Sequence, residues 1–245
     1  MLLWLKSLPD SLNKIKFYAF EFILIFVAVA AGAWVENLRE NLQEKDKEKQ
    51  LMLLMIGDLQ KDTAEISAQI KLLKTRRYGL DSITKLVYSN PSSQLNHTQL
   101  QRLQYNYVLP AATIGSNTRA KIQIEGVGHD IISSEKIVIG VLNYWALQKD
   151  ISFNNNRYQD YWWESRKLAY QLFDSRFIHR VNGVLTVSPE AKLLPHTDGQ
   201  LIQYCNWVSN MSALLEIIYV PNLEKQSKAA AELIILIQQE YDFEP

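Results

Sequence analysis

One carboxylate lies inside the most apolar stretch of this chain, and it is the side chain whose chemistry is easiest to argue. Residues 17–35 read FYAFEFILIFVAVAAGAWV, nineteen nearly uninterrupted apolar residues broken by Glu21. An ionisable group inside an apolar span is energetically expensive and usually has a polar partner or lies on an ion path. Chemistry at Glu21 would therefore be polar pairing, or proton or ion handling, within a membrane.

The residues that share a helical face with Glu21 are small or aliphatic. Ile25, Ala28 and Gly32 lie four, seven and eleven positions further along the chain. The spacing of Ala28 and Gly32 lets two helices approach closely. Three interpretations of the carboxylate stay open: it reaches back to the headgroups, it packs in a homo-oligomer, or it handles ions or protons.

Elsewhere the chain offers little catalytic chemistry. The four histidines are widely separated in sequence: His97, His129, His179 and His196. Neither an HExxH motif nor a Ser-His-Asp order with a nucleophile elbow is present. His129–Asp130 is the strongest candidate for a catalytic pair among them, but capping of the next helix by Asp130 or Ser133 explains this turn more simply. Because Cys205 is the single cysteine, a disulfide within the chain and a cysteine-based zinc site are excluded. We predict no catalytic residues, no metal and no cofactor.

The densest group of aromatic residues lies in the second half of the chain: Tyr158, Tyr161, Trp162, Trp163 and Tyr170. Adjacent Trp162 and Trp163 point to different sides of one helix. One indole should therefore be exposed, and we predict a partner-binding surface formed by the first four of these residues. The alternative is that a wide core, where helices of the bundle meet, buries both indoles.

The apolar run itself predicts a membrane anchor. At about 1.5 Å rise per residue, a helix over 17–35 crosses a hydrocarbon core of roughly 30 Å. A cleaved signal peptide is one alternative, which Ala31-Gly32-Ala33 would suit, but Glu21 interrupts its apolar region. A buried core helix is the other, but such helices seldom run this far without a polar face. An uncleaved single-pass anchor explains the stretch best.

The charges beside the run predict its orientation. Lysines precede it at positions 6, 14 and 16, whereas glutamates follow it at positions 36, 40 and 44. These flanks favour an amino terminus inside the cell. The predicted organisation is a cytoplasmic or interfacial leader over 1–16, a transmembrane helix over 17–35, a charged juxtamembrane stalk over 36–50, and a helical extracytoplasmic domain over 51–245.

The rest of the chain predicts an all-α fold. Neither Gly nor Pro interrupts residues 33–56, and a seam spaced by threes and fours reaches Leu80, which indicates one stalk helix to about Tyr88. The predicted seam residues are Leu38, Leu42, Lys45, Lys49, Met52, Ile56, Leu59, Thr63, Ile66, Ile70, Leu73 and Leu80. Further helices are predicted over 97–107, from Ser116 or Asn117 to Ile124, and over 135–177, 197–220 and 223–241, with one β-hairpin within 181–189. Long helices of this kind form an antiparallel helical bundle.

Some details of these helices are also predicted. Thr98 caps the helix over 97–107, Asn residues at 154–156 bend or break the helix over 135–177, and Pro221 separates the last two helices. The helix over 135–177 is expected to bury the following residues: Ile139, Leu142, Trp145, Ile151, Tyr158, Trp162, Leu168, Leu172 and Phe173.

Two blocks of the chain resemble a known family. WVENLRENLQEKDKEKQLMLLMIGDLQKDTAEI, which follows the apolar run, and SNTRAKIQIEGVGHDIISSEKIVIGVLNYW, over 116–145, are similar to the DUF6090-like family of uncharacterised single-pass membrane proteins of Bacteroidetes. The resemblance implies a place in the bacterial inner membrane with the bulk of the chain in the periplasm. It implies no activity.

The composition limits the function further. Lys plus Arg and Asp plus Glu number 26 each, so no excess of positive charge is present to bind nucleic acid. The sequence favours a non-catalytic, membrane-anchored scaffold or sensor-like interaction protein whose partners are the lipid bilayer, a second copy or another envelope protein. The alternatives are a homo-oligomeric membrane complex or accessory channel subunit packed through the Glu21 face, and a hydrolase.

Overall fold

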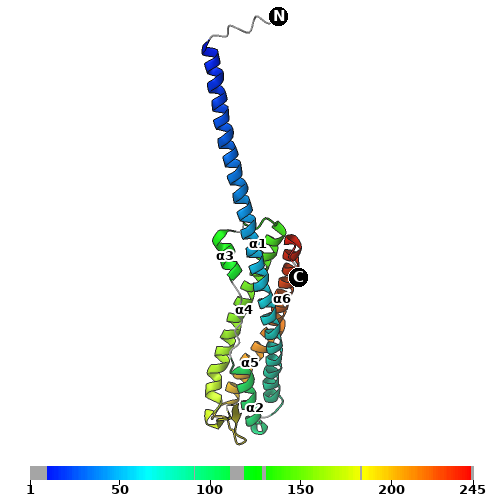
Figure 1. The fold of residues 1–245 in the computed structure, drawn as a ribbon. Coiled ribbons are helices and arrows are strands. Elements are labelled where there is room, and N and C mark those ends of the chain that lie inside the picture. The colour runs from blue at the N-terminus through cyan, green and yellow to red at the C-terminus, as the bar shows by residue number, and fades with distance from the viewer. Residues whose placement is uncertain (1–9, 91, 111–118, 129–130, 183, 244–245) are drawn as a thin grey trace. The chain divides into compact units, whose positions relative to one another are not determined.

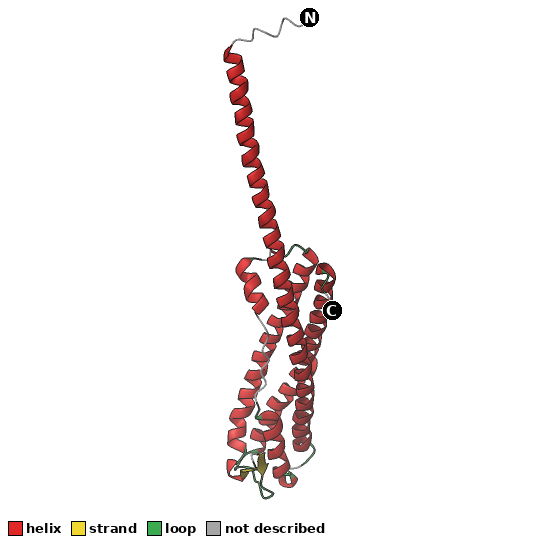
Figure 2. Ribbon diagram, in the orientation of Figure 1, coloured by secondary structure: helices red, strands yellow, loops and turns green. Residues whose placement is uncertain are grey.

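The structure is a computed structural model, and it describes residues 10–90, 92–110, 119–128, 131–182 and 184–243. The chain divides into two compact units, Met1–Leu51 and Met52–Pro245. Most of the chain is helical (Figure 2), which confirms the predicted helical class. Residues 1–9 of the predicted leader, the predicted caps Ser116 and Asn117, and the His129–Asp130 pair lie outside the described residues, whereas residues 10–16 of the leader are helical.

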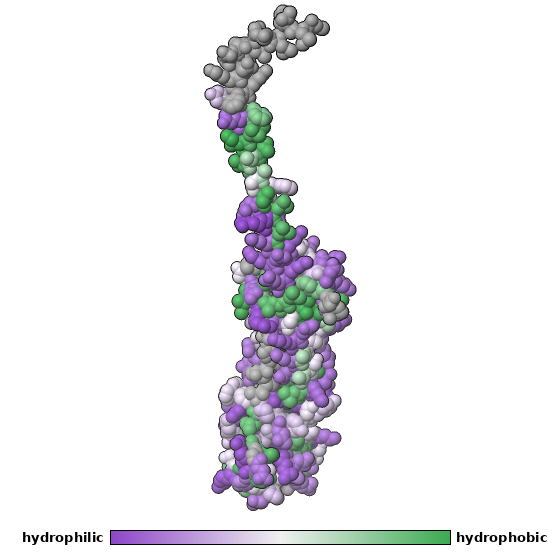
Figure 3. Space-filling model, viewed as in Figure 1, coloured by the Kyte–Doolittle hydropathy of each residue, from purple (hydrophilic) through white to green (hydrophobic). Residues whose placement is uncertain are grey.

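Helix α1 is the longest element and runs from Asp10 to Tyr88 without interruption, as predicted for the stalk helix. Its early part holds the one stretch, among the described residues, that is long and apolar enough to cross a membrane. None of that apolar window is buried, and in Figure 3 it forms a hydrophobic surface. A long apolar helix near the amino terminus is therefore present.

The second unit consists mainly of three long helical segments. They are the part of α1 from Met52 to Tyr88, helix α4 (Glu135–Leu172), and the consecutive segments α5 (Asp198–Leu214), η5 (Leu215–Tyr219) and α6 (Val220–Tyr241). Figure 1 shows α3 (Arg119–Val127) at one end of this unit and α2 (His97–Leu103) at the other. The two ends of the unit are thus built from different short elements.

The core of the second unit begins where the seam of α1 becomes continuous. The predicted seam residues of α1 that are buried are Met52, Ile56, Leu59, Ile66, Leu73 and Leu80. The earlier seam residues Leu38 and Leu42 are exposed. Polar contacts add to this packing, since Arg77 pairs with Glu216 at 2.5 Å and Lys74 with Glu224 at 2.8 Å.

Helix α4 buries a different face at its start from the one predicted. Ile139 and Leu142 are exposed, whereas Ile137, Val141 and Tyr144 are buried. The first turns of α4 carry aliphatic residues on both faces, so the sequence period alone does not identify the inward face. The later predictions are confirmed for the following residues: Ile151, Tyr158, Trp162, Leu172 and Phe173.

Two predicted details of helix starts and interiors are wrong. Asn96, not Thr98, caps α2 by accepting a hydrogen bond from the Gln99 amide, and the Thr98 hydroxyl donates to the Pro189 carbonyl at 2.7 Å instead. Helix α4 also continues through its Asn residues. Asn154 donates its side-chain N–H to the carbonyl of Asp150 four residues earlier, and the helix accommodates this bond without a break.

Pro221 does not separate the last helices either. Segments α5, η5 and α6 follow one another with no intervening loop, and Pro221 lies in the first turn of α6, so the helix continues past a residue that has no backbone N–H to donate. The π-helical turn η5 precedes it. The predicted start of α5 is confirmed, because Thr197 and Gln200 form a capping box.

The remaining described elements are a β-hairpin and three short helical turns. Strands β1 (Ile178–Val181) and β2 (Val184–Val187) form the predicted antiparallel hairpin, with Val181 opposite Val184 and Asn182 at φ 50°. The hairpin begins three residues earlier than predicted. Helix α2 continues into the π-helical turn η2 (Gln104–Val108), and short 3-10 turns occur at η1 (Ser92–Gln94) and η4 (Ser175–Phe177).

Candidate functional site

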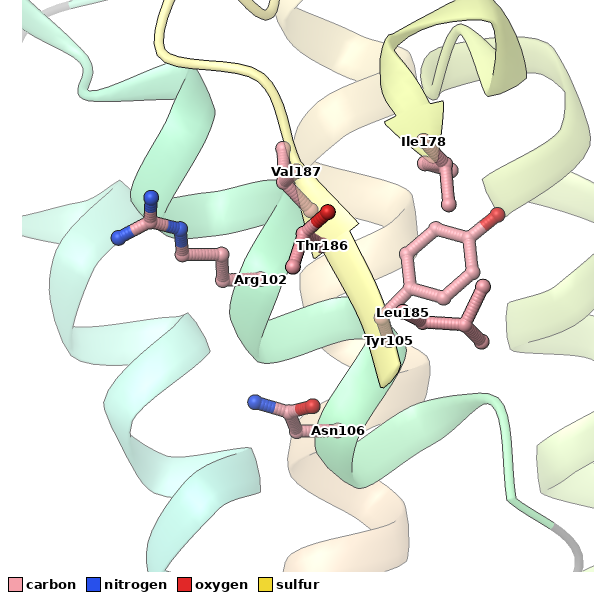
Figure 4. Close-up of a pocket in the computed structure, with 7 residues that line it drawn as sticks. All are labelled: Arg102, Tyr105, Asn106, Ile178, Leu185, Thr186 and Val187. Atoms are coloured by element: carbon pink, nitrogen blue, oxygen red, sulfur yellow. The ribbon is translucent and has the colours of Figure 1, made fainter. Parts of the chain in front are cut away.

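A pocket lies between η2 and the hairpin, with a volume of about 180 Å³. Four of its residues offer hydrogen-bond donors: Arg102, Tyr105, Asn106 and Thr186. The others form an apolar wall: Ile178, Leu185 and Val187. In Figure 4 the Tyr105 ring lies beside Leu185 and points toward Ile178, while Arg102 and Asn106 lie on the other side of β2. None of the described residues that line this pocket is acidic.

The π-helical turn η2 is held from two neighbouring helices. The Trp162 indole N–H donates to the Val108 carbonyl at 2.6 Å. The Tyr204 hydroxyl donates to the Gln104 side chain, and both of these residues are buried. Single π-helical turns are often found at functional sites. This turn carries Tyr105 and Asn106, which both line the pocket.

Next to the pocket lies a cluster that we name the aromatic–arginine cluster: Trp162, Trp163, Arg166 and Tyr170. The Arg166 guanidinium carbon lies 4.8 Å from the ring centre of Trp162, 5.8 Å from that of Trp163 and 5.4 Å from that of Tyr170. Its Nε donates to the Tyr170 hydroxyl at 2.5 Å. Cation–π stacking of this kind orders exposed aromatic rings.

The pocket and the cluster meet at Tyr105. Burial raises the pKa of the Tyr105 phenol, nearby Tyr170 raises it further, and the positive charge of Arg166 opposes both effects. Tyr105 therefore stays protonated at neutral pH and is available as a hydrogen-bond donor. This end of the unit combines a small amphipathic pocket with ordered aromatic rings.

The structure narrows the predicted partner-binding surface. Tyr158 is fully buried and stacks on Tyr219, and Trp162 is almost completely buried, so neither can form a surface. Trp163 is exposed and Tyr161 is partly exposed against Trp207. Of the adjacent indoles, one points inward and one outward, which agrees with the helical geometry from which the surface was predicted.

Two buried carboxylates on α1 were not predicted, and they join the two blocks that carry the family resemblance. Asp58 accepts hydrogen bonds from the Arg119 guanidinium and from the Ala120 backbone N–H at 3.0 Å. Asp62 accepts from the Tyr144 hydroxyl at 2.5 Å. The two aspartates are one turn apart and lie beside the apolar seam of α1, and that placement was the available signal.

These carboxylates have structural partners rather than catalytic geometry. Asp58 fixes the start of α3, and Asp62 fixes α4. Burial, followed by the hydrogen bond to Asp62, raises the pKa of Tyr144 well above its usual range. Proton transfer by this phenol at neutral pH is therefore unfavourable.

The residues predicted to pack within a membrane lie in the first unit. Glu21, Ile25 and Ala28 are exposed, and a Cβ atom added to Gly32 would meet nothing within 4 Å. The face is accessible along its whole length. Its packing role stays a prediction.

Other reactive groups do not form a site. No group of three His, Cys, Asp or Glu residues that could hold a metal ion occurs in the described part of the chain. Cys205 is buried, and burial raises the pKa of its thiol to about 12. The thiolate that would act as a nucleophile is therefore scarce at neutral pH.

Comparison with known proteins found no matching family model, no similar curated protein and no similar solved structure.

Proposed function

We propose that this protein is a non-catalytic, membrane-anchored interaction protein that binds a partner through the pocket between η2 and the hairpin. The observation that carries the proposal is the composition of that pocket. Donors from Arg102, Asn106 and Thr186 adjoin an apolar wall, as in recognition sites that combine shape with a few polar contacts. The nearby rings of Trp163 and Tyr170 are exposed, and exposed aromatic residues favour protein contacts.

The anchor in this proposal is the apolar start of α1. Its side chains from Tyr18 to Val35 are exposed, and water would solvate such a surface poorly. The flanking charges support a single pass with the amino terminus inside, and the family resemblance supports the inner membrane, with the bulk of the chain in the periplasm.

The polar groups of the second unit support an interaction role over an enzymatic one. The buried acids Asp58 and Asp62 are hydrogen-bonded to neighbouring helices, and Asp174 is held by Arg176, whose guanidinium lowers the pKa of that carboxyl. None of these acids lines the pocket between η2 and the hairpin. The pocket instead offers hydrogen-bond donors and apolar side chains, which can bind a partner without any acid-base chemistry.

Photo-crosslinking in native membranes tests the proposed binding surface. We expect Leu185→p-benzoylphenylalanine to give a discrete covalent adduct on irradiation, because Leu185 is half-exposed on the pocket wall. The same amino acid at Ile217 is the matched control, since Ile217 is exposed and lies outside the pocket. The adduct should also weaken when Arg102→Glu is combined with the probe. Equal adducts at both positions, or none at Leu185, contradict the proposal.

A homo-oligomeric membrane complex, or an accessory channel or transporter subunit, is the second candidate function. It is favoured by the open face of Glu21, Ile25, Ala28 and Gly32, where small residues permit close helix contact. The mass of the detergent-extracted particle separates the candidates. A monomer would remove the oligomeric complex and leave the interaction protein.

A further inference from the structure

Helix α4 carries a second apolar stripe on the side that faces away from the core. Its buried positions advance by threes and fours from Ile137 to Leu172, apart from one step of seven between Tyr144 and Ile151. Between them, on the outward side, another series has the same spacing: positions 139, 142, 146, 149, 153, 156, 160, 163, 167 and 170. We name these ten positions the outer stripe.

The outer stripe is unusually apolar for an exposed helix face. Its apolar members are Ile139, Leu142, Ala146, Phe153, Trp163 and Tyr170. The five large ones among them are from 47% to 64% exposed. The outer face of a surface helix is normally polar, whereas a stripe repeating every 3.5 residues is the pattern of a helix that packs on another helix.

The charges within the stripe favour a second copy of α4 in the opposite direction. Reversing the stripe about its midpoint, between residues 154 and 155, places Lys149 opposite Asp160, and Asp160 opposite Lys149. Both side chains are exposed. The same reversal places Ala146 opposite Trp163, so a small residue receives a large ring. Phe153 then lies opposite Asn156, near the twofold axis.

Parallel pairing of the same stripes is unfavourable. Each residue would then face its own copy, which brings Lys149, Asp160 and Lys167 each against a like charge. Antiparallel pairing removes all three repulsions and replaces two of them with opposite charges. From this complementarity we propose that the outer stripe of α4 is an antiparallel, homophilic contact between two copies of this protein.

The length of the stripe indicates a weak contact. From residue 139 to residue 170 the helix extends about 47 Å, and one helix seam of this length buries less surface than a standard interface of about 800 Å² per partner. Because α4 spans the second unit, the pairing puts the Met52 ends of the two copies at opposite ends of the pair.

The test uses full-length protein reconstituted at one copy per nanodisc, so that contacts between anchors within one membrane cannot join the copies. We expect mass photometry to show pairs of discs in a concentration-dependent manner. K149E and D160K should each weaken pairing by about tenfold, because each reverses two charge pairs in the dimer. The combined K149E/D160K chain should recover to within about threefold of the wild type.

Two controls keep the outcomes distinct. Ile217→Asp changes an exposed residue off the stripe and should leave pairing unchanged, whereas Phe153→Asp should abolish it with an unaltered melting temperature. Absence of disc pairs in the wild type, or a combined variant as weak as K149E, overturns the antiparallel contact. If the chain does not enter discs, the anchor fails instead, and the same charge series is measured on free full-length protein by sedimentation.

Discussion

Gly79→Val should destabilise the second unit by about 3 kcal/mol. Gly79 lies on α1 where the helix meets the π-helical turn η2, and a Cβ atom at this position would overlap the Tyr107 ring. The valine side chain forces the ring or the turn to move, and η2 also forms a wall of the candidate pocket. The measurement is the free energy of unfolding by chemical denaturation.

A matched change elsewhere on the same helix isolates the cause. Gly57 has nothing within 4 Å of an added Cβ atom, so Gly57→Val should change stability by less than about 0.5 kcal/mol. Tyr107→Ala in the Gly79→Val chain should recover part of the loss, because it removes the obstructing ring. A loss at Gly79 that Tyr107→Ala does not reduce would show that the ring is not the obstacle.

Asp58→Ala should cost about 2–3 kcal/mol and selectively loosen α3. Asp58 is buried, and its loss leaves the Ala120 backbone N–H without its acceptor and the Arg119 guanidinium without its counter-ion. Arg119 itself is half-exposed, so water offsets part of the lost ion pair. Hydrogen exchange of the α3 amides, together with the free energy of unfolding, measures the effect.

Two further variants test this explanation. Asp58→Asn keeps one oxygen for the Ala120 N–H and should lose less than the alanine variant. Glu125→Ala removes an exposed ion pair with Lys121 on the same helix and should change stability by less than about 0.5 kcal/mol. Equal effects of Asp58→Ala and Glu125→Ala would contradict the assignment of Asp58 as the contact that holds α3.

The extents of the long helices could be predicted from the sequence because residues close together in the chain determine them. The apolar seam from Met52 to Leu80, the end of α1 at Tyr88 and the Thr197 cap are each determined by residues within a few turns of one another. The hairpin is similar, since Asn182 adopts the positive φ that its turn requires.

The wrong predictions concern positions where the local sequence allows two conformations or two buried faces equally well, and contacts with other helices determine which one occurs. Ile139 and Leu142 are as apolar as Ile137 and Val141, and only the neighbouring helices determine which pair is buried. Pro221 signals a break, but the first turn of α6 accommodates it without one.

The candidate site was harder to predict than the fold, because its residues are far apart in the sequence. Arg102 and Leu185 meet in the pocket although more than eighty residues separate them, and no local pattern predicts that meeting. The aromatic group around Trp163 was visible as composition. The cation that orders it, Arg166, became evident only from the ring geometry.

The proposed function depends most on which side of the membrane holds the second unit, because the pocket must lie in the same compartment as its partner. Gln203→Cys, exposed on α5, should react with a membrane-impermeant maleimide in cells whose inner membrane is intact. The native Cys205 is buried and gives no background. Ser7→Cys, before the apolar run, should react only after the membrane is disrupted. Labelling of Gln203→Cys that requires disruption, or release of the protein by alkaline carbonate, would contradict an anchored protein with its second unit outside the cytoplasm.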